Sequence, residues 1–173
     1  VKPINEYIFH SKLIVSKAEF ITLYNSRNKN LTKEELKLRN EQYISKYLSL
    51  IKENKKPAEN YFYYYHLGNK FIDNNKYNDA LKAYQSAYKI YVRHNLNKKD
   101  PFYYNILLSI VKVLLFKLNN FEEVMPFIDE LIEIAHNIPD PLFFKAYYYQ
   151  KKEAYEKAIE IYLKTIDIIN NKN

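Results

Sequence analysis

Acidic side chains between residues 122 and 133 come closest, in this sequence of 173 residues, to a pattern that could do chemistry: Glu122, Glu123, Asp129, Glu130 and Glu133. Paired carboxylates can act as a general acid and a general base. Between them, apolar side chains recur at helical spacing, namely Val124, Phe127, Ile128 and Leu131. We therefore predict that the acids form the solvated face of an amphipathic helix and not a catalytic pair.

The other residue types that carry chemistry are few or far apart. The four histidines are His10, His66, His94 and His136, and none has a His or Cys at the spacing of metal ligands. The single glycine, Gly68, leaves no glycine-rich loop for a phosphate. The absence of cysteine excludes disulfides and thiolate chemistry. The sequence predicts a non-enzymatic protein without catalytic residues, metal or cofactor.

A spaced set of aromatic and small residues predicts two helices that pack closely: Tyr64, Leu67, Gly68, Phe71, Tyr77, Ala80, Tyr84 and Ala87. We expect Gly68 and Ala80 to lie where the helices cross, because small residues allow a close approach. Aromatic rings then fill the space around the crossing. The set resembles the tetratricopeptide repeat (TPR) family, whose unit is a helix-turn-helix of about 34 residues.

The pattern recurs twice. One recurrence is Phe121, Val124, Ile128 and Leu131, and the other is Tyr155, Ala158, Tyr162 and Thr165. Phe121 and Tyr155 are 34 positions apart, whereas Tyr77 and Phe121 are 44 apart. The surplus falls in the polar residues 94–101, where an insertion would lengthen a turn. At the crossings the third unit has Ala146 and Ala158, and the middle unit has Lys112 and Val124.

The predicted fold is all-α: a right-handed TPR-like superhelix of about three helix pairs, preceded by a long helical hairpin. We expect the hairpin at residues 1–56 and the TPR-like domain at 57–173, with repeats at about 61–94, 102–138 and 139–170. A helical bundle whose aromatic stripes only mimic the repeat is the alternative. The longest apolar segment, residues 106–116, is interrupted by polar residues and too short to span a bilayer.

Residues 1–56 read as two amphipathic helices. The first has apolar residues at helical spacing: Ile4, Tyr7, Ile8, Ile14, Ala18, Ile21 and Tyr24. Polar residues 25–30 break the pattern, and Thr32 with Glu35 then forms a capping box that opens a second helix of about 20 residues. The apolar stripe of the second helix is Leu36, Tyr43, Tyr47, Leu50 and Ile51. The hairpin docks either on the repeats in cis or on a second copy or another protein.

Positive charge is concentrated in the hairpin. Residues 1–60 hold 12 Lys and Arg against 7 Asp and Glu, and residues 61–173 hold 15 against 13. Peripheral membrane contact through the hairpin is one use of such charge. Nucleic-acid binding is disfavoured, because only three arginines are present and the lysines alternate with glutamates.

The resemblance to TPR proteins implies a concave groove lined by the first helix of each pair. The implied groove residues are Phe62, Tyr65, Asn69 and Ile72, then Ile106, Ser109, Val113 and Phe116, then Asp140, Phe143, Tyr147 and Gln150. Some relatives bind a C-terminal carboxylate with Lys and Asn in this groove; Asn69 matches that pattern and Tyr65 does not. An apolar groove suits an amphipathic helix or an extended apolar segment of another protein.

The implied function is an adaptor that binds and stabilises another protein. The alternative is the peptide-sensing TPR domain of a bacterial transcriptional regulator, whose DNA-binding domain would precede Val1. We also expect self-association through the hairpin or through the last helix, whose apolar residues are Ile161, Thr165, Ile166 and Ile169. A missing capping helix is the alternative explanation for the apolar residues of the last helix. Composition and the start at Val1 favour a bacterial chain from which a signal, an anchor or a domain has been removed, in the cytoplasm or on the periplasmic side of the envelope.

Overall fold

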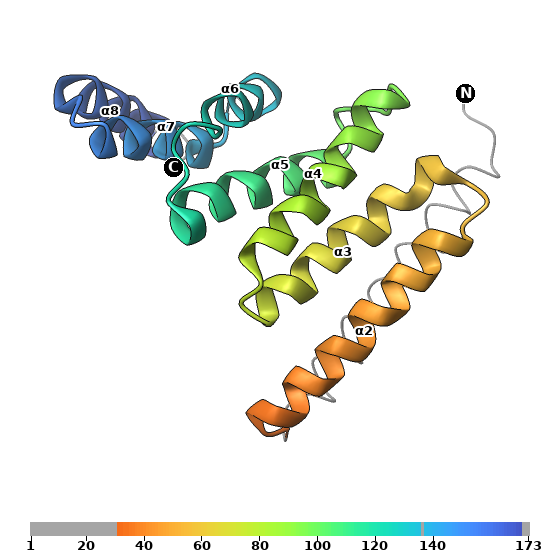
Figure 1. Ribbon diagram of the computed structural model, residues 1–173. Coiled ribbons are helices and arrows are strands. Elements are labelled where there is room, and N and C mark those ends of the chain that lie inside the picture. Colours follow the sequence, from red (N-terminus) through yellow and green to blue (C-terminus); the bar gives the residue numbers. More distant parts are fainter. Residues whose placement is uncertain (1–30, 136, 171–173) are drawn as a thin grey trace. The chain divides into compact units, whose positions relative to one another are not determined.

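The computed structural model describes residues 31–135 and 137–170. Of these residues, 81% lie in helices and none in a strand. Seven of the helices are α-helices. The predicted all-α class is confirmed (Figure 1). The elements are α2 (Lys33–Glu53), η1 (Pro57–Glu59), α3 (Asn60–Asp73), α4 (Tyr77–Arg93), α5 (Pro101–Val113), η2 (Leu114–Leu118), α6 (Met125–Ile134), α7 (Pro139–Lys151) and α8 (Tyr155–Asn170).

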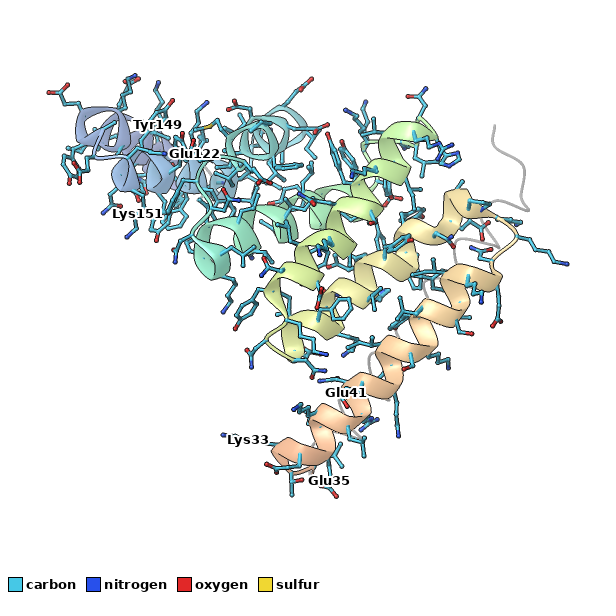
Figure 2. All side chains as sticks on the ribbon, in the orientation of Figure 1. Lys33, Glu35, Glu41, Glu122, Tyr149 and Lys151 are labelled. Atoms are coloured by element: carbon cyan, nitrogen blue, oxygen red, sulfur yellow. The ribbon has the colours of Figure 1, made fainter. Side chains whose placement is uncertain are left out.

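The chain divides into two compact units, Val1–Arg39 and Asn40–Asn173. In the first unit, the capping box at the start of α2 is confirmed. The Thr32 backbone N–H donates to Glu35 Oε2 (2.8 Å), and the Glu35 N–H donates to Thr32 Oγ1 (3.2 Å). These bonds lower the pKa of Glu35, with the backbone hydrogen bond as the main cause. Glu35 lies near the start of α2 in Figure 2. The first helix of the predicted hairpin, with His10, lies outside the described residues.

In the second unit, the part of α2 from Asn40 onward packs on the helices that follow it. Ile44 and Tyr47 are buried together with Leu67 of α3 and Ala83 of α4. A side-chain hydrogen bond from Asn40 Nδ2 to Asn74 Oδ1 (3.3 Å) accompanies this contact. This part of the predicted hairpin therefore docks in cis. The boundary predicted after residue 56 stays a prediction.

The crossing of α3 and α4 is as close as the sequence predicts. A Cβ atom built on Gly68 would lie 2.5 Å from the ring of Tyr84, and Ala80 is fully buried. The Tyr84 hydroxyl donates to Asn69 Oδ1 (2.6 Å), so the same ring also ties α4 to α3. Figure 1 shows the two helices side by side. Gly68 is therefore required for contact between the helices and not for a turn.

Replacing Gly68 with alanine should lower the free energy of unfolding by about 1–3 kcal/mol, because the new methyl group overpacks the crossing. Lys82→Ala, at an exposed position of α4, should stay within about 0.5 kcal/mol of wild type. Urea denaturation of both variants measures the difference. Equal urea midpoints for Gly68→Ala and Lys82→Ala would mean that α3 and α4 can move apart at Gly68 without loss of stability.

Three turns between paired helices share one backbone conformation. Asn75, Asn119 and Glu153 have φ of 59°, 50° and 60°, in the left-handed region. Each turn is closed by a backbone hydrogen bond across it, for example from the Lys76 N–H to the Phe71 carbonyl (2.8 Å). The intervals between the three residues are 44 and 34 positions, the same as the intervals predicted between the pairs. In the described residues these turns join α3 to α4, α5 with η2 to α6, and α7 to α8, which we call the first, middle and third pairs.

The middle pair differs from the prediction. Lys112 is exposed and does not lie at the crossing, whereas Leu115 is fully buried. Lys112 lies in the regular part of α5, on the face opposite its buried residues, and the π-helical turn η2 begins only at Leu114. The third pair agrees with the prediction, since Ala146 and Ala158 are both buried.

The apolar helical stretch at the centre of the chain is longer than the predicted segment 106–116. It runs over Pro101–Leu118 and, by length and composition alone, could cross a membrane; 44% of it is buried inside the fold. Its fully buried residues belong to the main core cluster: Tyr103, Ile106, Leu107, Ile110, Val111, Leu114 and Leu115. The stretch therefore contributes seven fully buried side chains to the core.

Candidate protein-binding surface

The acidic residues of α6 are not all solvated. Only 15% of the Glu130 side chain is exposed, and its carboxylate accepts hydrogen bonds from the Tyr88 hydroxyl (3.0 Å), the Tyr103 hydroxyl (2.5 Å) and Lys98 Nζ (2.6 Å). The prediction that Glu130 lies on the wet face is therefore wrong. Burial alone would raise its pKa, but the three hydrogen bonds together lower it. Burial also raises the pKa of Tyr103.

Other acids of the same region remain exposed and paired with lysines. Glu122 forms an ion pair with Lys152, and Asp129 accepts from Lys145 Nζ (2.8 Å). In the part of the chain that the structure describes, no group of three or more His, Cys, Asp and Glu side chains could hold a metal ion. His136 and His10 lie outside that part. The carboxylates thus act as acceptors that join helices.

A second polar contact fixes the turn before α5. Asp100 accepts from the Phe102 N–H (2.9 Å) as the N-cap of α5 and from the Tyr91 hydroxyl (3.0 Å). The sequence carries a signal for this cap, because aspartate followed by Pro101 is typical of a helix start. The partner Tyr91 carries no such signal. With Lys98 and Glu130, this contact attaches the inserted residues 94–101 to α4 and α6.

The groove residues predicted in the first pair are engaged in packing. The rings of Phe62 and Tyr65 lie against Phe102, with centroids 5.6 and 5.4 Å apart, and Tyr65 also lies 5.8 Å from Tyr84. Asn69 holds the Tyr84 hydroxyl. These side chains are half-buried, so they present a reduced surface to a partner.

The groove residues predicted in the middle pair are divided. Ile106 and Val113 are buried in the core and cannot contact a partner, which corrects their assignment to a binding groove. Ser109 is half-buried and donates to the Asn105 carbonyl (2.8 Å). Phe116, at the π-helical turn, is 41% exposed.

An aromatic cluster joins Phe116 to the third pair. The ring of Phe116 lies 5.1 Å from that of Tyr147, and the ring of Phe143 lies 6.5 Å from Tyr147 and 5.9 Å from Tyr162 of α8. Phe143 is 42% exposed. Three of the predicted groove residues, Phe116, Phe143 and Tyr147, are thus brought together on an accessible surface.

Exposed apolar side chains continue from this cluster along α8. Those between 46% and 59% exposed are Tyr155, Ile159, Leu163, Ile166 and Ile169. Of the residues predicted on this face, Ile166 and Ile169 are exposed, but Thr165 is buried and donates to the Ile161 carbonyl (2.8 Å). The prediction missed Ile159 and Leu163, although their spacing from Ile166 is helical.

We call the following set the apolar surface: Phe116, Phe143, Tyr147, Ile159, Tyr162, Leu163 and Ile166. Its continuity follows from Tyr162, which contacts Phe143 on one side and is a helical neighbour of Ile159 and Ile166 on the other. Isolated exposed apolar residues are ordinary, whereas a contiguous group is a candidate interaction surface.

No protein-family model matches the chain, and no curated protein sequence matches it significantly.

Proposed function

We propose that this protein is a non-enzymatic adaptor that binds another protein through the apolar surface. The observation that carries the proposal is the aromatic cluster of Phe116, Phe143 and Tyr147, which continues into the exposed stripe of α8. Large aromatic side chains are the usual anchors of protein interfaces. An amphipathic helix is the partner that fits best, because its own apolar stripe matches that of α8 in length and spacing.

We further propose that the three helix pairs form a TPR-like superhelix. Three features support this: the close approach at Gly68, the buried Ala146 and Ala158, and left-handed turn residues at intervals of 44 and 34 positions. Repeats of this kind contact mainly their neighbours in sequence and leave extended surfaces for partners. Function in such folds depends on the surface and not on the fold itself.

Ile166→Asp should weaken binding of a protein co-purified from the native cell at least about tenfold, because an unpaired charge would be buried in an apolar interface. Val92→Asp is the matched control: Val92 is 52% exposed, Ile166 is 49% exposed, and both lie near the end of a helix. Isothermal titration calorimetry on the full chain measures both affinities. Equal losses in the two variants, or none in Ile166→Asp, would contradict the proposal.

A further inference from the structure

We propose that the segment bound at the apolar surface is a basic amphipathic helix, whose lysines or arginines lie along the outer edge of α8. This inference rests on the proposed function and adds the charge of the partner. It follows from the order of side chains around α8, where an apolar stripe is bordered by a row of acids.

The order follows from helical geometry. Successive residues turn by about 100°, so Ile159, Leu163 and Ile166 lie within about 60° of one another. The buried positions Ala158 and Thr165 adjoin this stripe on the side that faces α7. On its other side three acids follow within about 40° of one another: Glu156, Glu160 and Asp167. A helix lying along the stripe therefore has one flank beside these carboxylates.

The acids are available to a partner. Glu160 accepts from Lys164 Nζ (2.6 Å), but both side chains are more than 60% exposed, and such a pair contributes little and exchanges readily. Among the described residues, no ion pair involves Glu156 or Asp167. Lys164 and Lys157 lie further around the helix, on the far side of the acidic row. Positive charge on the partner would thus be attracted along the α8 flank, whereas on the α7 side Lys151 Nζ, 5.3 Å from the Tyr147 ring centroid, would repel it.

Three designed peptides test the inference on the full chain. Two share leucines at coiled-coil spacing and carry either lysine or glutamate at the flanking positions; the third has the lysine peptide's composition in shuffled order. We expect the lysine peptide to bind about tenfold more tightly than the glutamate peptide at low salt. The preference should shrink at about 0.5 M salt, where charges are screened. The shuffled peptide, which has no apolar stripe, should not bind.

Variants locate the effect. Glu156→Gln/Asp167→Asn should reduce the preference for lysine, because only Glu160 then remains on this flank. Glu123→Gln/Glu133→Gln, two exposed acids near or on α6, should leave the preference unchanged. Equal binding of both amphipathic peptides would overturn the inference and leave the proposed function intact. Binding of the shuffled peptide would overturn the inference, because it would show that charge alone attracts the peptides without an apolar stripe. If neither amphipathic peptide binds, both the inference and the proposed amphipathic partner are wrong for this surface. A dimer of the free chain that Ile166→Asp dissociates would also contradict both, because a second copy would then cover the surface.

Discussion

Replacing Phe143 and Tyr147 together with alanine should weaken binding of the native partner by about 2–4 kcal/mol, which is about 30- to 1,000-fold in Kd. Phe143 is 42% exposed and Tyr147 is half-buried beside it, and removing both rings leaves a gap where a partner's apolar side chains would pack. Because Tyr147 also packs against the main core, the variant should lose some stability, but the buried side chains of Phe144, Ala146 and Ala158 should keep the helices folded. Calorimetric titration and a thermal melt measure the two effects separately.

Leu38→Ala/Leu48→Ala is the matched control. Both leucines lie on α2 and are 60% and 50% exposed, so the variant also removes two large exposed apolar side chains. Affinity should stay within about threefold of wild type. If this control loses affinity and the aromatic variant keeps it, the binding surface lies on α2 and the proposal for the third pair is wrong.

Replacing Glu130 with alanine should lower the free energy of unfolding by about 2–4 kcal/mol, because two tyrosine hydroxyls lose their acceptor and Tyr103 is fully buried. Asp129→Ala, the adjacent residue with 54% of its side chain exposed, should cost less than about 1 kcal/mol. Chemical denaturation of both variants at neutral pH gives the comparison. A cost for Asp129→Ala as large as that for Glu130→Ala would show that the hydrogen bonds to Glu130 add nothing.

The lowered pKa of Glu130 adds a dependence on pH. Its contribution to stability is complete above the pKa of the unfolded chain, about 4.3, and is lost as pH falls through the lower pKa of the folded protein. Glu130→Gln removes this ionisation, so the variant should lose less stability than wild type between about pH 5 and pH 3. Parallel losses in the two proteins would assign the acid sensitivity to other carboxylates.

Features with a distinctive residue pattern were predictable from the sequence. In the capping box, Thr32 and Glu35 bond to each other's backbone N–H groups at the start of α2. Because the two residues are only three positions apart, their types alone predict these hydrogen bonds. Gly68 was predictable because a helix interior disfavours glycine unless another helix approaches closely. Asn75, Asn119 and Glu153, the left-handed residues in the turns within the three pairs, keep the predicted intervals of 44 and 34 positions.

Features that depend on distant residues were not predictable. Glu130 lies at the edge of the apolar stripe of α6, so the sequence pattern does not show whether it is buried. Its environment depends on Tyr88 and Tyr103, which lie 42 and 27 positions away. A π-helical turn follows α5 at Leu114–Leu118, and no residue type in this segment specifies it. The repeat pattern assigns both Ile106 and Phe116 to the groove, but Ile106 is fully buried in the core, whereas Phe116 is 41% exposed beside Tyr147 of the third pair.

Hydrogen–deuterium exchange of the full chain, with and without its co-purified partner, tests the central claim most directly. Docking on the apolar surface should slow amide exchange in α7 and α8, residues 139–170, because a bound helix suppresses local opening of the helices beneath it. Exchange in α2, residues 33–53, should be unchanged. Protection confined to α2, with none in α7 and α8, would contradict a binding site on the third helix pair.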